Sequence, residues 1–286
     1  MISVITPSFN QGKYIERTIQ SVLTQHIPGL EYFVVDGGSQ DETVSILERY
    51  SSQLRFVSEK DKGQADAVNK GLRLTSHDII GWLNSDDVYF PNTIKTVLDF
   101  FAQHPDVDVV FGKANHIDQY DQFIEEYPTE EWNIERLKKT CILSQPAVFF
   151  RRRVVEKFGD LNINLNFCLD YEFWLRLALR GAKFSYLPHV FAGSRLYPET
   201  KTVSSPRRAQ REAIQMLKGH LGYVPEEWLI RDAVVFVKDK TQLKMPEWRY
   251  KFSVAVMSIV MGFRWNGFLR GLVSCVRLPK AILNRG

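Results

Sequence analysis

Small polar and acidic residues follow three short apolar runs in the first third of the chain. The three segments are Thr6-Pro7-Ser8-Phe9-Asn10, Asp36-Gly37-Gly38-Ser39 and Asn84-Ser85-Asp86-Asp87. Carboxylates repel a phosphate unless a divalent cation lies between them, and Mg²⁺ and Mn²⁺ prefer hard oxygen ligands. If these segments meet in space, they would suit a metal ion bound together with a diphosphate.

The elements around these segments alternate between short β-branched runs and helical patterns. We predict strands over residues 2–6, 31–35, 54–58 and 78–83, with helices over 12–24, 41–50, 64–74 and 91–103. Such alternation is typical of an α/β fold whose parallel sheet is covered by helices. Ligands bind at the carboxyl ends of the strands in such sheets, which is where the polar segments lie.

The second half of the chain is less regular and ends in helices. Short strands are predicted over 107–111, 148–150 and 183–187, a helix over 170–179 and an extended segment over 191–197. From residue 205 onward the periodicity indicates helices only, over 206–221, 226–237, 247–263 and 267–276. We therefore predict two domains, an α/β domain at residues 1–203 that carries the polar segments and a helical region at 204–286.

Composition and missing motifs exclude several classes of protein. Of the 286 residues, 44% are hydrophobic and 24% are charged, which excludes collagen-like, disordered and disulfide-scaffold proteins. No G-x-G-x-x-G sequence follows a strand, and no G-x-x-x-x-G-K-[ST] sequence occurs. Neither Rossmann-type dinucleotide binding nor a P-loop is therefore supported.

The sequence around the polar segments resembles the family 2 glycosyltransferases with the GT-A fold. The resemblance is carried in order by residues 34–43 (VVDGGSQDET), 61–71 (DKGQADAVNKG) and 82–87 (WLNSDD), within a similarity that covers about residues 1–200. It implies a Rossmann-like, mostly parallel sheet flanked by helices, followed here by a helical C-terminal appendage. It also implies an inverting enzyme that uses a nucleotide-diphosphate sugar.

The resemblance assigns donor-binding roles residue by residue. Asp36 matches the acid that recognises the nucleotide base, with a turn residue as the alternative. Thr6, Ser8 and Asn10 match the loop that lines the nucleoside pocket. Asp66 matches a further acid nearby, with an exposed helix carboxylate as the alternative. Asn84-Ser85-Asp86 stands in place of the D-x-D motif, so Asp86 would be the principal ligand of Mn²⁺ or Mg²⁺, and Asp87 could simply cap the next turn.

The segment Cys168–Leu177 resembles the part of the family that supplies the catalytic base. Asp170 occupies the matching position, and a role as helix N-cap is the alternative. Glu172 would project about 200° away around the helix and could not serve the same pocket. Gln145 lies in a segment that resembles the acceptor side.

One departure from the family concerns the metal shell. Relatives often carry a His where this chain has Tyr197, and a neutral Tyr is a poor ligand for Mg²⁺. Arg195 and Lys201 could instead neutralise the leaving diphosphate, although long basic residues on a loop are commonly only solvated.

Charge is distributed unevenly along the chain. Residues 1–200 contain 21 basic and 27 acidic residues, whereas residues 201–286 contain 16 and 6, and no carboxylate follows Glu247. Cationic and aromatic residues without acids fit amphipathic helices at a membrane interface, and packing on protein is the alternative. Nucleic-acid binding is not supported, because the body is acidic and the basic tail is apolar.

Three scattered cysteines and an N-terminus without signal-peptide features predict a cytoplasmic protein. The basic C-terminal helices predict that it is peripheral at the inner face of the membrane. The predicted function is metal-dependent, inverting transfer of a sugar, favouring a UDP-sugar donor, in cell-surface polysaccharide or glycolipid assembly. The acceptor would be a glycan or a lipid-linked molecule. A nucleotidyltransferase and a non-catalytic nucleotide-sugar-binding module are the alternatives.

Overall fold

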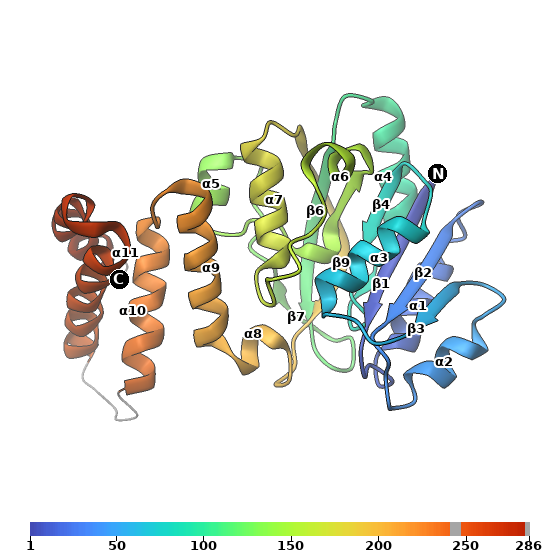
Figure 1. Cartoon of the computed structure of the whole chain (residues 1–286), viewed down its shortest axis with the longest axis horizontal. Helices are drawn as coiled ribbons and strands as arrows, with labels where there is room; N and C mark the ends of the chain where they lie inside the picture. The colour runs from blue at the N-terminus through green and yellow to red at the C-terminus, as the bar shows by residue number, and fades with distance from the viewer. Residues whose placement is uncertain (241–246, 284–286) are drawn as a thin grey trace. The chain divides into compact units, whose positions relative to one another are not determined.

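The computed structural model describes residues 1–240 and 247–283 (Figure 1). Contacts within the chain divide it into two compact units. The first comprises residues 1–134 and 142–197, and the second comprises residues 135–141 and 198–286. The functional division proposed from the sequence, at residues 203 and 204, remains a proposal.

A single mixed sheet forms the centre of the first unit. Its order is β3 (Arg55–Ser58), β2 (Glu31–Asp36), β1 (Ile2–Ser8), β4 (Ile79–Trp82), β8 (Val148–Arg151), β6 (Val109–Ile117), β9 (Phe184–Arg195) and β5 (Val88–Tyr89), with β7 (Phe123–Glu126) paired to β6. The pairs β3–β2, β2–β1, β1–β4 and β6–β9 are parallel, and the other pairs are antiparallel. The predicted α/β class is confirmed, and the parallel half corresponds to the regular βα alternation of the sequence.

Helices cover both faces of this sheet. Val4 of β1 and Val34 of β2 pack in one core with apolar residues of α1 (Ile15–Leu23), α2 (Thr43–Arg49) and α4 (Thr93–Gln103). Phe33 and Val35 face the other way and pack on Ala67 of α3 (Gln64–Leu74). Alternate strand residues thus bury against opposite helix layers, as the period of a strand requires. The same unit contains α6 (Arg153–Phe158), α7 (Leu169–Leu179) and a short 3₁₀ turn (Gln145–Ala147).

The segment predicted as a strand followed by an extended stretch is one long strand, β9. Its pairing with β6 shifts register between Gly112 and Ala114, opposite the part of β9 that contains Pro188. Proline has no amide hydrogen to donate to the ladder, so the pairing is interrupted there and resumes beyond it.

The second unit is helical. It contains most of α5 (Ile134–Lys139), then α8 (Lys201–Ser204), α9 (Pro206–Leu221), α10 (Glu226–Lys240) and α11 (Glu247–Leu283). Gly267 has a φ of 74° and breaks α11 into two helices, which agrees with the predicted break between residues 263 and 267. Within residues 1–240 and 247–283, no helix combines the length and apolar character needed to cross a bilayer.

Candidate active site

The carboxyl ends of the parallel strands lie level with one another. The register pairs Ser58 with Asp36 and Asp36 with Ser8, so β3, β2 and β1 end together. On the other side of β1, the amide of Leu83 donates to the carbonyl of Ile5 at 3.0 Å. The loop at residues 84–87 therefore starts at the same edge, and the structure brings the three polar segments together.

Asp36 is fully buried, and its carboxylate is held by the loop that follows it. Oδ2 accepts hydrogen bonds from the amides of Gly38 (3.1 Å) and Ser39 (2.9 Å) and from the hydroxyl of Ser58 (2.6 Å). Oδ1 accepts only the Ser39 hydroxyl, at 2.5 Å. Each carboxylate oxygen accepts about two hydrogen bonds, so Oδ1 retains capacity for one more donor. Asp36 thus acts as a turn residue, and its Oδ1 has one unused acceptor position.

Replacing Asp36 by Asn tests the turn role directly. One oxygen becomes an NH₂ group that faces amide and hydroxyl donors, so we expect the free energy of unfolding to fall by about 1–3 kcal/mol. Urea unfolding without any nucleotide measures this loss. Asp99→Asn, an exposed position on α4, is the control. An unchanged midpoint for Asp36→Asn would contradict the structural role.

The first-strand residues differ in how deeply they lie. Thr6 is buried in the sheet, with its hydroxyl 3.2 Å from that of Tyr32. Asn10 ties two loops together, because its Oδ1 accepts from the amide of Gln40 at 2.9 Å. The hydroxyl of Ser8 is buried and has no hydrogen-bond partner. Of the three predicted residues, Ser8 has the clearest unused bonding capacity.

Most side chains of the 84–87 loop hold the loop itself. Asn84 Oδ1 accepts from Gln64 Nε2 (2.7 Å) and Trp82 Nε1 (3.0 Å), and Ser85 is buried. Asp87 is also buried, and burial together with the charge of Asp86 raises its pKa well above the usual range. A strand rather than a helix follows Asp87, so the capping alternative is wrong. Asp86 is the partly exposed carboxylate of this loop.

Arg195 supports this loop from the end of β9. Its Nε donates to the carbonyl of Asp86 at 2.7 Å, and its Nη1 forms an ion pair with Asp121. The side chain is buried, its guanidinium lies 5.0 Å from the centre of the Tyr14 ring, and Nη2 has no hydrogen-bond partner. The alternative that Arg195 is merely solvated is therefore wrong.

Tyr197, the residue that departs from the expected metal-shell pattern, contacts Asp86. The phenol donates to Asp86 Oδ2 at 2.8 Å, and the ring packs against Tyr14 at 4.8 Å. Burial raises the pKa of the Tyr197 phenol, and the Asp86 charge raises it further, so the hydroxyl stays protonated. Tyr197 is thus a donor that orients Asp86.

Asp170 lies in the first turn of α7 and is partly buried. Trp174, four residues on, shares its helix face, and the Trp174 ring lies 6.4 Å from that of Trp82 at the end of β4. This contact directs the Asp170 face of α7 towards the carboxyl end of β4. Cys168 is the N-cap, so the capping alternative for Asp170 is wrong.

Glu172 faces away from the site, as its helical position predicts. It is buried and forms an ion pair with Arg176 at 2.8 Å. Arg176 also donates to the carbonyls of Phe158 (2.6 Å) and Asp160 (2.8 Å). The pair therefore fixes the chain that precedes α7.

Two motif residues of α3 contribute to the architecture. Asn69 bonds the backbone of Leu161 in both directions, at 2.8 and 3.0 Å, which anchors the segment leading to α7. A Cβ at Gly71 would lie 2.4 Å from Ile5, so only glycine lets α3 approach β1 this closely. Asp66 accepts from the amide of Lys62 at 3.1 Å and is partly exposed.

The sequence prediction missed two residues near this edge. Burial raises the pKa of Asp61, and the carboxylates of Asp66 and Asp36 add to the rise. Asp61 lies within a quoted motif, so its position could have identified it. Asp121 pairs with Arg195 and Arg17, and no local pattern marks it.

Some of the buried polar atoms without hydrogen-bond partners lie at this edge. In the part of the chain that the structure describes, these are Ser8 Oγ, Gln11 Oε1, Gln145 Oε1 and Arg195 Nη2, and the others belong to Tyr89, Thr129, Trp174 and Trp228. Gln145 is held in place by its amide, which donates to the carbonyl of Trp82 at 2.6 Å. Each unpaired buried group costs about 1–3 kcal/mol of folding free energy.

A divalent ion fits this site only together with a ligand. No group of three or more His, Cys, Asp or Glu side chains placed to hold a metal occurs among the described residues. One oriented carboxylate, that of Asp86, suits a Mg²⁺ or Mn²⁺ ion whose remaining ligands are phosphate oxygens and waters.

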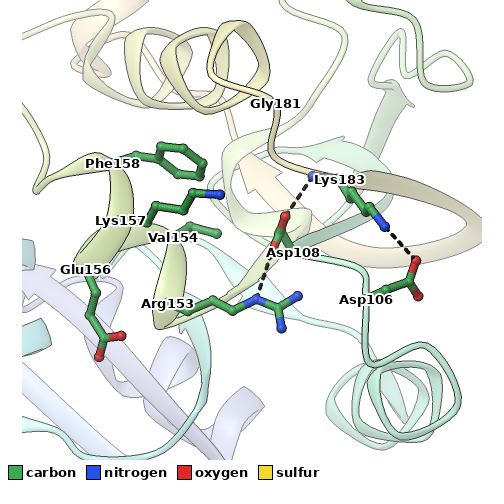
Figure 2. A pocket seen from close by; sticks show the side chains of 9 residues that line it. All are labelled: Asp106, Asp108, Arg153, Val154, Glu156, Lys157, Phe158, Gly181 and Lys183. Carbon is green, nitrogen blue, oxygen red and sulfur yellow. Dashed lines mark hydrogen bonds and ion pairs between the residues drawn. The ribbon is translucent and has the colours of Figure 1, made fainter.

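A separate cavity of about 520 Å³ lies at the opposite edge of the sheet, at the amino ends of β6 and β9 (Figure 2). Arg153 pairs there with Asp108 at 2.7 Å, and Lys183 pairs with Asp106 at 3.1 Å. None of the predicted site residues lines this cavity.

Comparison with known proteins gives consistent matches. The Glycosyl transferase family 2 model matches residues 3–159. Chondroitin synthase of Escherichia coli is 30% identical over 209 residues, which cover 71% of this chain and only 30% of that protein. An uncharacterized glycosyltransferase of Rickettsia prowazekii is 25% identical over 92% of this chain and 87% of its own length.

Solved structures share the fold. TarS 1–349 of S. aureus, in complex with UDP-GlcNAc, has a TM-score of 0.64 at 17% identity and covers 99% of this chain and 90% of its own. PcManGT of Pyrobaculum calidifontis, a mannosyltransferase in complex with GDP-Man and Mn²⁺, has a TM-score of 0.55 at 18% identity and covers 100% and 75%. The family match extends over more than half of the chain. The protein is a glycosyltransferase and belongs to glycosyl transferase family 2.

Proposed function

We propose that this glycosyltransferase moves a sugar from a nucleoside diphosphate sugar to an acceptor hydroxyl, with inversion at the anomeric carbon and with Mn²⁺ or Mg²⁺ bound alongside the donor. The main support is the set of buried polar atoms without partners at the carboxyl ends of the strands. They lie where the register brings Ser8, Asp36 and the Asp86 loop together. Ser8 Oγ and Arg195 Nη2 could donate to phosphate oxygens, and the two Gln Oε1 atoms could accept from sugar hydroxyls.

The donor half of the site would use the ends of β1, β2 and β4. The free acceptor position on Asp36 Oδ1 suits an N–H of the nucleotide base. Thr6, Ser8, Asn10 and Asp66 would line the nucleoside pocket, and Asn84 and Ser85 would shape the loop that presents Asp86. The similar structures contain UDP-GlcNAc, UDP and GDP-Man, which supports a nucleotide sugar and leaves UDP-sugars as our preferred donor class.

The diphosphate would lie against Asp86 and Arg195. A divalent ion bound there would neutralise negative charge on the departing diphosphate. Tyr197 holds the Asp86 carboxylate through its hydroxyl, and Arg195 holds the Asp86 backbone. The unpaired Nη2 of Arg195 adds a fixed cationic donor at this position.

Asp170 would act as the general base on the acceptor side. The acceptor hydroxyl attacks the anomeric carbon while its proton moves to the Asp170 carboxylate, and the bond to the diphosphate oxygen breaks on the opposite face of the sugar. Gln145 would contact the acceptor through its buried Oε1. The acceptor class that we propose is a glycan or a lipid-linked molecule, in polysaccharide or glycolipid assembly, and the E. coli relative is named a chondroitin synthase.

Ligand-dependent thermal stabilisation tests the donor proposal. With a UDP-sugar at about 100 times its Kd and Mn²⁺ present, we expect about 2.7 kcal/mol of stabilisation and a melting temperature raised by roughly 5–10 °C. Without Mn²⁺ the rise should largely disappear. GDP-mannose serves as the competing donor. The melting temperature of Asp86→Asn should not rise with the UDP-sugar, either with or without Mn²⁺.

Two outcomes would overturn the proposal. Equal stabilisation with and without Mn²⁺, together with no release of nucleoside diphosphate, would indicate a non-catalytic binding module. Full stabilisation of Asp86→Asn would remove the metal role from that carboxylate. Asp99→Asn, at an exposed position on α4, should respond as the unaltered protein does.

A further inference from the structure

The first part of α11 carries an apolar stripe on its exposed side. Phe252, Val256 and Val260 lie one turn apart, and their exposed fractions are 66%, 44% and 50%. Phe268, just beyond the break at Gly267, is 70% exposed and contacts the ring of Phe263. A solvent-facing helix surface is ordinarily polar, so this stripe is suited to burial against another surface.

The opposite side of the same helix already supplies the packing that the fold needs. Val254, Ser258 and Met261 are buried. Trp265 Nε1 donates to Asp232 of α10 at 3.2 Å. The exposed stripe is therefore additional to the face that holds α11 in its own unit.

Positively charged residues lie at both ends of the apolar stripe. Arg249 and Arg264 continue the three- and four-residue spacing of Phe252, Val256 and Val260, and both are exposed. The only acid of α11, Glu247, is paired with Lys251 at 3.0 Å. Seven Arg and Lys residues and no carboxylate follow Glu247 in the sequence.

This charge pattern distinguishes between two occupants of the stripe. If two copies of the helix paired through the stripe, Arg249 would lie near Arg264 of the other copy in an antiparallel pair, or near its own equivalent in a parallel pair. Either arrangement brings like charges together and offers no carboxylate on this face. An anionic surface suits this pattern, because its headgroups attract the positive charge while its acyl region accepts Phe and Val.

We propose that the α11 face formed by Arg249, Phe252, Val256, Val260 and Arg264 binds an anionic lipid surface. The helix lies in the plane of the interface with its apolar stripe among the acyl chains and its two Arg side chains at the headgroups. This inference concerns where the enzyme works, and it holds whichever nucleotide sugar the site uses.

Flotation of the full chain with vesicles tests the proposal. We expect the protein to float with vesicles of phosphatidylcholine containing about 30% phosphatidylglycerol and to stay in solution with phosphatidylcholine alone. Raising the salt to about 1 M should weaken partitioning, because the Debye length falls to about 3 Å. Arg264→Gln should weaken it about fivefold, and Val256→Asp by roughly tenfold or more.

Matched variants elsewhere in the helical unit provide the controls. Val203→Asp changes an exposed valine of α8, and Arg211→Gln changes an exposed arginine of α9, so both should float as the unaltered protein does. All of these side chains are exposed, and equal melting temperatures would show that the variants fold. Equal flotation of Val256→Asp and Val203→Asp would overturn the proposal. So would a lipid-free dimer, detected by light scattering, that Val256→Asp dissociates, since a second copy would then occupy the stripe.

Discussion

Asp170→Asn is expected to bind donor and metal normally and to lose transfer by about 10²–10⁴-fold in kcat, the range that a positioned general base supplies. The amide has the same shape as the carboxylate but cannot take a proton from the acceptor hydroxyl. Because Asp170 lies on α7 and the donor residues lie on β1, β2 and the Asp86 loop, the loss should fall on turnover. Release of nucleoside diphosphate and thermal stabilisation by the donor measure the two effects separately.

Asp160→Asn is the matched control for that variant. Asp160 lies in the segment before α7, and its carboxylate makes only an exposed ion pair with Arg73 at 3.6 Å. We expect this control to keep its turnover. Near-normal turnover in Asp170→Asn would remove the base role from Asp170, and a parallel loss of donor stabilisation would indicate a disturbed site instead.

Glu172→Gln is expected to lower the free energy of unfolding by about 3–5 kcal/mol, because it leaves the buried guanidinium of Arg176 without its carboxylate. Arg176 would keep its bonds to the carbonyls of Phe158 and Asp160, which solvate the charge without neutralising it. Urea unfolding followed by circular dichroism measures the change.

The Lys95–Asp99 pair on α4 offers a control with the same i,i+4 spacing in an exposed setting. Asp99→Asn should cost at most about 1 kcal/mol, since exposed pairs contribute little. If Glu172→Gln costs no more than this control, the pair does not stabilise α7. The double variant Glu172→Leu, Arg176→Met removes both charges and should recover much of the loss.

The sequence predicts the parallel half of the sheet well because apolar periodicity and burial coincide there. The predicted helices at residues 64–74 and 206–221 have the observed bounds of α3 and α9. The exposed strand β7 shows no such periodicity, since all of its residues face solvent, and it was not predicted. The full length of β6 and β9 depends on pairing between segments about 75 residues apart, which no local pattern contains.

In the candidate site too, local sequence motifs predict some residues, whereas contacts between residues far apart in the chain are not predictable from them. Local motifs that resemble the family indicate Asp36 and Asp86 at strand ends and Asp170 in the first turn of α7. The support of Asp86 by Arg195 and Tyr197 involves residues 109 and 111 positions away, so only the fold identifies it. That support also gives Tyr197 a structural role, because its hydroxyl orients the Asp86 carboxylate.

The distance along the chain between Asp86 and Arg195 also sets when the site can be completed during synthesis. At about 5–20 residues per second, roughly 5–20 s separate the emergence of the two residues from the ribosome. During that interval the Asp86 loop lacks the strand that holds it. A fragment ending at residue 159, where the family match ends, would contain Asp36 and Asp86 but neither Asp170 nor Arg195. The candidate site is therefore completed only when β9 joins the sheet, and we expect a nascent chain to gain activity no earlier than that.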